Sequence, residues 1–228
     1  MPLKGFIQQK KLFRFYKTLI NKNDLCFDIG ANLGRKSKIF LSLGAKVIAF
    51  EPQSSCSKAL LKIQNKNKDF TFIRAGVGES NGLEELFIGS HIEVSTFSKK
   101  FMRFFENEAI YWPRSEPIEV MTLNTILKTY GVPDYCKIDT EGYELKILES
   151  LNQPIPFIEF EFTSGFMDET IQIIHKLSSL GPTKWNYILN ENPIFKLSNW
   201  VSSHEMMALF ETLPQYRLHG NLYVKTEI

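Results

Sequence analysis

Three short apolar runs near the N-terminus alternate with segments of helical spacing, and no other feature limits the possible folds as strongly. The runs are Leu25–Gly30, Lys46–Pro52 and Phe70–Gly78, and each ends in a glycine or a proline. The segments between them, Lys36–Leu43 and Ser54–Asn65, have the spacing and stop signals of helices. Continuously apolar strands are typical of parallel sheets that helices cover on both faces. The order therefore predicts an α/β fold with a parallel sheet.

The rest of the chain continues this alternation after a loose stretch. Strands are predicted over residues 85–88, 135–139 and 156–162 and in the runs WNYIL and NLYVK, and helices over residues 122–130, 141–151 and 168–180. Residues 89–117 have no clear period, and a segment of that length is typical of a functional lid or binding loop. No repeat or second boundary is evident, so residues 1–228 are predicted to form one domain with a helical extension over residues 1–24.

Composition and charge narrow the function classes. A net charge of +2 gives no strong attraction to nucleic acid or to an anionic membrane, so no nucleic-acid partner is expected. No run approaches the length of a membrane span. The three cysteines have neither zinc nor disulfide spacing, which favours a reducing, cytoplasmic location. The basic N-terminal segment is expected to pack as a helix on the core, with a membrane-surface helix as the alternative.

Glycines and acids gather where the predicted strands end, which is where open α/β sheets bind ligands. The first strand ends in DIGANLG, so Asp28 precedes a turn that Gly30 and Gly34 permit. Glu51 ends the second strand about twenty residues after that turn, where an acid can accept hydrogen bonds from both hydroxyls of a ribose. These positions predict a nucleoside site.

The residue types also discriminate between nucleoside cofactors. Gly76 and Glu79 lie in the AGVGE loop after the third strand, which is expected to form a wall beside an adenine. A dinucleotide site requires GxGxxG, so that a helix N-terminus can bind pyrophosphate. Here the spacing is DxGxNxG, and a carboxylate at Asp28 would repel a phosphate. S-adenosylmethionine carries an adenosine, a sulfonium and an ammonium but no phosphate, so the pattern favours it over NAD.

Five segments carry a resemblance to a known family: CFDIGANLG, AFEP, MTLNTIL, YCKIDTEGYELKILESL and PFIEFEF. In this order they resemble the FkbM family of S-adenosylmethionine-dependent methyltransferases, from about Leu25 to the end of NLYVK. The resemblance implies the class I methyltransferase fold, a Rossmann-like three-layer sandwich with a mostly parallel seven-stranded sheet whose last strand is antiparallel. It also implies O-methylation of a hydroxyl on a sugar, glycan or small natural product, with cofactor binding by Asp28, Gly30, Asn32, Gly34 and Glu51.

Two places depart from the family's pattern. Arg35, Lys36 and Ser37 stand where the family often has an aromatic residue soon after the second motif glycine, and this changes the expected local packing. Asn124 stands where the family usually has an aspartate. Because this change removes a carboxylate, no acid–base role is assigned to Asn124.

The acids after the fourth and fifth strands are the candidate catalytic residues. Asp139 lies next to the expected position of the transferred methyl group and is predicted to contact the cofactor and to act as the base, with Glu141 and Glu161 as partners. Three carboxylates would equally suit a divalent cation such as Mg²⁺, although no residue is assigned as a metal ligand. Glu141 has the alternative role of a first-turn helix acid, and Glu144 is expected at the helix surface.

Residues 89–117 are expected to select the acceptor, with aromatic side chains that either stack on a sugar ring or form a hydrophobic lid. A small-molecule or carbohydrate acceptor is favoured. The alternatives are a methyltransferase that acts on RNA or protein, a nucleotide-binding dehydrogenase, and a cofactor-binding module without catalysis.

Overall fold

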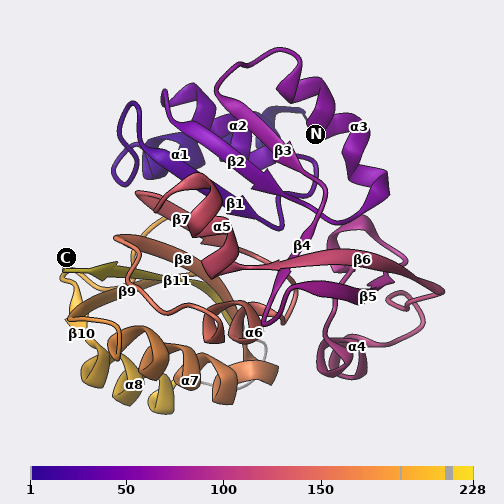
Figure 1. Cartoon of the computed structure of the whole chain (residues 1–228). Helices are drawn as coiled ribbons and strands as arrows, with labels where there is room; N and C mark the ends of the chain where they lie inside the picture. The colour runs from indigo at the N-terminus through magenta and orange to yellow at the C-terminus, as the bar shows by residue number, and fades with distance from the viewer. Residues whose placement is uncertain (1, 191, 214–217, 228) are drawn as a thin grey trace.

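The computed structural model describes residues 2–190, 192–213 and 218–227, which form a central sheet between two layers of helices (Figure 1). The eight-stranded sheet has the order β10-β9-β11-β8-β7-β1-β2-β3. Its strands are β1 (Leu25–Ile29), β2 (Lys46–Phe50), β3 (Phe70–Ile73), β7 (Tyr135–Ile138), β8 (Phe157–Thr163), β9 (Thr183–Leu189), β10 (Val201–Ser202) and β11 (His219–Thr226). The predicted α/β class is confirmed.

Strand direction follows the class I methyltransferase pattern that the resemblance implied. β3, β2, β1, β7 and β8 are parallel neighbours, and β11 runs antiparallel between β8 and β9. A mostly parallel sheet with an antiparallel last strand is therefore confirmed, and the two final apolar runs pair as expected. The two-residue β10, antiparallel to β9, is an eighth strand that the sequence did not predict.

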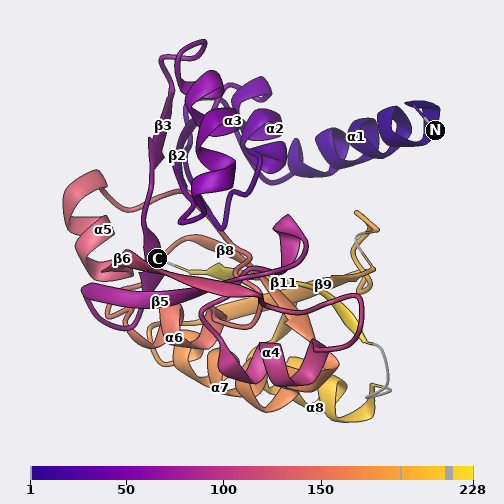
Figure 2. The ribbon, with the colours of Figure 1, turned by 90° about the vertical axis from the view of Figure 1, so that its right-hand side faces the viewer.

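Alternating side chains in the strands build a separate core on each face of the sheet. In β2, Ile48 and Phe50 join the core beneath α5 to α8, whereas Val47 and Ala49 join the core beneath α1 to α3. Figure 2 shows these two helical layers on opposite sides of the sheet. The helices are α1 (Pro2–Tyr16), α2 (Arg35–Ser42), α3 (Ser54–Gln64), α4 (Lys99–Phe105), α5 (Leu123–Tyr130), α6 (Glu144–Glu149), α7 (Met167–Ser178) and α8 (Ser203–Thr212).

A second, three-stranded sheet corrects two predictions. The predicted third strand over residues 70–78 is divided, because a hydrogen bond from the Ala75 N–H to the Ile73 carbonyl (3.0 Å) turns the chain out of the main sheet. The later part becomes β4 (Gly76–Gly78), which with β6 (Arg114–Thr122) and β5 (Gly82–Ile88) forms the order β4-β6-β5. The stretch over residues 89–117 is also more regular than predicted, since it contains a 3-10 turn at Ile92–Val94, α4 and the first residues of β6.

The helix predicted over residues 141–151 is shorter than expected and begins later. Glu141 and Gly142 have φ angles of 56° and 81°, in the left-handed region that an α-helix excludes. As a result α6 starts at Glu144 with Tyr143 as its N-cap residue. Glu141 is therefore not a first-turn acid of this helix, and its side chain is available to the site described below.

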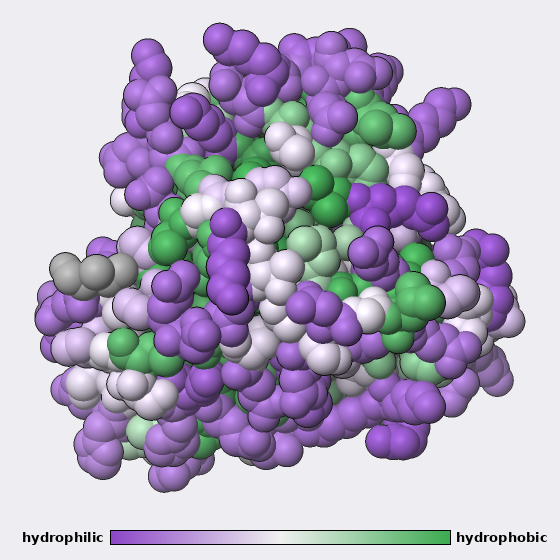
Figure 3. Space-filling view, in the orientation of Figure 1, coloured by the Kyte–Doolittle hydropathy of each residue, from purple (hydrophilic) through white to green (hydrophobic). Residues whose placement is uncertain are grey.

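The outer surface is mainly polar. Hydrophilic side chains cover most of the face in Figure 3, and apolar residues show mostly toward its middle. Within the described part of the chain, none of the helices has both the length and the apolar character that crossing a membrane requires.

Candidate functional site

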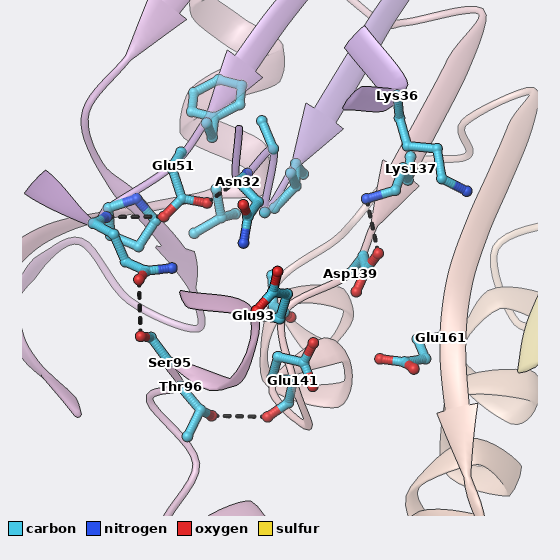
Figure 4. Close-up of a pocket in the computed structure, with 18 of the residues that line it drawn as sticks. Asn32, Lys36, Glu51, Glu93, Ser95, Thr96, Lys137, Asp139, Glu141 and Glu161 are labelled. Atoms are coloured by element: carbon cyan, nitrogen blue, oxygen red, sulfur yellow. Dashed lines mark hydrogen bonds and ion pairs between the residues drawn. The ribbon is translucent and has the colours of Figure 1, made fainter. Parts of the chain in front are cut away.

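The carboxyl ends of β1, β2, β7 and β8 open into a cavity of about 340 Å³, which we call the strand-end cavity. Figure 4 shows Glu51 on one side of it and Lys36, Lys137 and Glu161 on the other. Of the residues predicted from the sequence, seven line it: Gly30, Asn32, Glu51, Gly76, Asp139, Glu141 and Glu161. These residues therefore gather at the sheet edge where the sequence predicted a ligand site.

Glu51 is fixed by two backbone hydrogen bonds. Its Oε2 accepts the Asn32 N–H (2.8 Å) and its Oε1 accepts the Gln53 N–H (2.9 Å). Asn32 can present its N–H because its φ is 49°, in the left-handed region that asparagine tolerates better than most residues. Burial raises the pKa of Glu51, and the two N–H donors partly oppose that rise. Each carboxylate oxygen retains acceptor capacity that faces the cavity.

Gly30 has the turn conformation that the sequence predicted, with a φ of 75°. A β-carbon at Gly30 would lie 1.8 Å from the carbonyl oxygen of Asp139. The glycine therefore also lets the end of β1 approach the end of β7. Gly34 likewise packs against a neighbouring helix, since a β-carbon there would meet the Ile63 side chain of α3 at 2.5 Å.

A buried lysine lies between two of the predicted acids. The Lys137 ammonium is 3.4 Å from Asp28 Oδ1 and 3.1 Å from Asp139 Oδ2, and the lysine side chain is only 2% exposed. Ser37 Oγ donates a hydrogen bond of 2.5 Å to the other oxygen of Asp28. Burial opposes the charge on Lys137, but the two aspartates outweigh it and raise its pKa. Burial would also raise the pKa of Asp139, yet Lys137 and Lys36 lower it.

Asp139 and Glu141, from the segment after β7, come together with Glu161, from the end of β8. One carboxylate oxygen of each lies within 4.8 Å of the others. Burial and the negative charge of Asp139 raise the pKa values of both Glu141 and Glu161 well above the ordinary glutamate value. Lys137 only partly offsets this crowding of charge. The cluster therefore combines one ionised aspartate with two glutamates that hold protons more strongly than usual.

Glu144 is not the surface acid that the sequence predicted. It is buried at the start of α6, where its Oε1 accepts hydrogen bonds from the Thr140 N–H (2.8 Å) and hydroxyl (3.0 Å). Burial raises its pKa to about 7, while the Thr140 N–H opposes that rise.

A second cavity, of about 740 Å³, adjoins the first and is called the aromatic cavity below. Phenylalanines supply much of its apolar wall: Phe101, Phe104, Phe105, Phe162 and Phe166. It shares Glu141, Glu161 and His219 with the strand-end cavity. Its described lining residues include glutamates but neither lysine nor arginine. The carboxylate cluster thus stands at the junction of the two cavities.

Three predicted cofactor residues do not line the strand-end cavity. Asp28 is completely buried behind it, and Gly34 packs beneath it. Glu79 lies on the surface, 55% exposed, and pairs with Lys146 (3.0 Å). The sequence reasoning missed Lys137 and Lys36, which do line the cavity. A lysine inside the otherwise apolar run YCKI was the available signal for Lys137, because such a charge must be paired when it is buried.

Residues 28–189 match the model of the methyltransferase FkbM domain, which is more than half of the chain. The chain belongs to the FkbM methyltransferase family. The resemblance seen in the sequence is therefore confirmed, and the protein is a methyltransferase whose cofactor is S-adenosylmethionine. None of the curated proteins matches the sequence.

Several solved methyltransferase structures are similar to this FkbM methyltransferase. Precorrin-6y C5,15-methyltransferase from Geobacter metallireducens is 10% identical, with 96% of this chain and 87% of that chain covered and a TM-score of 0.51. An rRNA methylase from Streptococcus thermophilus is 9% identical, with 95% and 94% covered and a TM-score of 0.46. A Streptococcus mutans protein in complex with SAH is 12% identical, with 94% and 95% covered and a TM-score of 0.44. At 10% identity the likeness to the Geobacter metallireducens structure concerns the fold alone.

Proposed function

We propose that this FkbM methyltransferase transfers the methyl group of S-adenosylmethionine to a hydroxyl of a sugar, a glycan or a small natural product. The observation that carries the proposal is the meeting of two cavities at the carboxylate cluster, where Glu141 and Glu161 line both. Cofactor and acceptor can then occupy separate spaces and meet at groups able to accept a proton.

The strand-end cavity has the chemistry that this cofactor requires. Glu51 retains acceptor capacity for the hydroxyls of a ribose, because each of its oxygens accepts only one backbone N–H. Acids on the opposite side suit a positively charged ligand. S-adenosylmethionine supplies an electrophilic methyl group on a sulfonium, and the acceptor oxygen displaces S-adenosylhomocysteine from it. The residues of this chain hold the two reactants in line, which by itself can remove a large part of the barrier.

The aromatic cavity is the proposed acceptor site, and the insertion over residues 89–117 builds one side of it. The same insertion reaches the cofactor side, where the Ile92 carbonyl accepts hydrogen bonds from Asn32 (3.2 Å) and Gln53 (3.1 Å). Phenylalanine faces suit the apolar face of a sugar ring or a natural-product scaffold. Because glutamates line this cavity without lysine or arginine among its described residues, a phosphorylated or otherwise anionic acceptor is disfavoured.

Glu161 is the proposed base, in place of Asp139. A general base works best when its pKa lies near the working pH. Lys137 lowers the pKa of Asp139 and makes it a weak base, whereas burial and neighbouring charges raise the pKa of Glu161. In this scheme Glu161 takes the hydroxyl proton, Glu141 tunes Glu161 through its charge, and Asp139 faces the positively charged cofactor.

The same three acids would also suit Mg²⁺, which would acidify the hydroxyl by coordination. We favour direct proton transfer because the Lys137 ammonium already neutralises Asp139 at 3.1 Å. Full activity after exhaustive EDTA treatment is the expected result. Loss of activity that only Mg²⁺ restores would replace direct transfer with the metal route.

Two glutamine variants test whether Glu161 is the base. Glu161→Gln is expected to lower kcat by roughly 10²- to 10⁴-fold, the usual contribution of a general base. Glu141→Gln removes a like charge that raises the pKa of Glu161, so the rising limb of its pH–kcat profile is expected at lower pH than in the wild type. The affinity of each variant for S-adenosylhomocysteine serves as the control. Wild-type kcat in Glu161→Gln would remove Glu161 from this role.

An acceptor screen with labelled S-adenosylmethionine tests the substrate class. Matched pairs of neutral and phosphorylated sugars and glycans are the informative acceptors, and the neutral member of each pair is expected to be methylated. Incorporation of label into RNA or protein, with none into neutral hydroxyl compounds, would overturn the proposed acceptor class and leave the methyltransferase assignment intact.

A further inference from the structure

Lys36 is a cation at the edge of the strand-end cavity that the proposed chemistry does not use. It lies in the first turn of α2, lines the cavity and faces the same side as Lys137 in Figure 4. Its ammonium donates a hydrogen bond to the Tyr16 hydroxyl at 2.8 Å and lies 5.1 Å from the centre of the Tyr16 ring. No carboxylate among the described residues forms an ion pair with it. A half-buried ammonium with only a neutral partner has donors available for an anion.

A buried polar network holds the partner of Lys36 in place. The Tyr16 hydroxyl donates to both oxygens of Glu159 at 3.1 Å, and the hydroxyls of Tyr135 (2.5 Å) and Tyr223 (3.1 Å) donate to the same carboxylate. Glu159 and the three tyrosines are completely buried. Burial raises the pKa of each tyrosine, so the hydroxyls stay protonated and continue to donate at neutral pH. The Tyr16 oxygen is thereby directed toward Lys36 as an acceptor.

The network connects the N-terminal helix to the strand-end cavity. Tyr16 is the last residue of α1, and Leu12 of the same helix contributes to the cavity wall. The Lys36 charge also lies close enough to Asp139 to lower the pKa of that carboxyl. This side of the cavity therefore places a cation and an anion side by side, opposite Glu51.

The cofactor has a matching pair of charges at one end. In S-adenosylmethionine the sulfonium joins the ribose to a methionine group that ends in an ammonium and a carboxylate. With the ribose at Glu51 and the methyl group at the acids, the amino-acid end extends to the side that holds Asp139 and Lys36. We propose that Lys36, positioned by Tyr16, binds the carboxylate of the cofactor's methionine group, while Asp139 faces its ammonium. The N-terminal helix is then part of the cofactor site.

This inference rests on the cofactor and not on the acceptor, so a failed acceptor screen would leave it standing. Its test is calorimetric binding of two ligands: S-adenosylhomocysteine, which has the carboxylate, and decarboxylated S-adenosylmethionine, which lacks it. Lys36→Met is expected to lower the affinity for S-adenosylhomocysteine about tenfold, which corresponds to the loss of one charge-assisted hydrogen bond. Binding of the decarboxylated ligand is expected to change less than about twofold, because the interaction removed is absent from that complex.

Two controls make the result specific. Lys38→Met removes an exposed lysine from the same helix and is expected to change neither affinity. Arg35→Met tests the neighbouring cation on α2 that also lines the cavity. Three results would overturn the proposal. Lys36→Met could weaken the binding of both ligands equally, or it could weaken the binding of neither. The third such result is a carboxylate-specific loss of affinity in Arg35→Met alone.

Tyr16→Phe tests the positioning role separately. It keeps the aromatic ring and removes the hydroxyl that Lys36 contacts, so a carboxylate-specific loss smaller than that of Lys36→Met is expected. A merely structural role for Tyr16 would lower the melting temperature without changing the ratio of the two affinities, and that outcome would remove Tyr16 from the proposal. If Tyr16→Phe does not fold, the Lys36 and Arg35 variants still decide the binding role.

Discussion

Two lysines in this protein make nearly the same contacts in different surroundings, and comparing them tests how burial sets the strength of an ion pair. Lys137 bridges Asp28 and Asp139 at 3.4 and 3.1 Å, and Lys146 bridges Glu79 and Glu149 at 3.0 and 3.2 Å. The Lys137 side chain is 2% exposed and that of Lys146 is 46% exposed. If contact geometry alone set stability, Lys137→Met and Lys146→Met would cost the same.

Burial predicts a large difference between the two variants. Lys137→Met fills the same space but leaves two aspartates without their cation, and removing one partner of a buried ion pair costs about 3–5 kcal/mol. For a chain of this length that cost corresponds to a fall in Tm of roughly 6–20 °C. Lys146→Met breaks only solvent-exposed pairs and is expected to cost less than about 1 kcal/mol. Urea denaturation followed by circular dichroism measures both free energies of unfolding.

The pH dependence of this stability difference tests whether the buried ion pairs cause it. Lys137 lowers the pKa of Asp139 in the folded state, so this contribution is fully present above the unfolded pKa of aspartate, about 3.9. It is lost as the pH falls through the lower folded value. The difference in free energy of unfolding between wild type and Lys137→Met is therefore expected to decrease below about pH 4. Equal costs for the two lysine variants at pH 7, or a gap that widens in acid, would refute the reasoning.

Two further variants test the packing of the site and the acceptor cavity. Gly30→Ala is expected to destabilise the fold by more than the roughly 1–2 kcal/mol that a left-handed backbone costs a non-glycine residue, because its β-carbon would also meet the Asp139 carbonyl at 1.8 Å. Gly82→Ala, also at positive φ but with no atom within 4 Å of the β-carbon, is the control in the same urea assay, and equal losses would exclude the clash as the cause. Phe104→Ala is expected to raise KM for the acceptor by about tenfold through lost aromatic contact, with unchanged affinity for S-adenosylhomocysteine. Leu83→Ala, at an exposed position outside both cavities, is its control, and an unchanged KM in Phe104→Ala would argue against the aromatic cavity as the acceptor site.

Local patterns were sufficient for the α/β class and for the sheet edge at which the candidate site residues gather. Hydrophobic runs, glycines and strand-end acids are properties of short segments, so the sequence alone assigns DIGANLG, Glu51 and Asp139 to one edge of the predicted sheet. The α6 start was missed because it depends on the backbone of Glu141 and Gly142, whose left-handed angles have no marker in hydrophobic period. The regular elements within residues 89–117 were missed for another reason, since the strand pairs with a segment that precedes it and the helix is short.

The sequence by itself determined the fold class, the family and therefore the cofactor, because these depend on motifs that are contiguous in the chain. Tertiary structure decided the electrostatic surroundings of the charged groups. Asp139 was the expected base, but a buried lysine two residues earlier lowers its pKa, while Glu161 and Glu141 are crowded together and keep theirs high. The contact between Lys36 and Tyr16, which are twenty residues apart, likewise exists only in three dimensions. A pKa or an ion pair is set by distance and burial, and neither can be read from the spacing of residues along the chain.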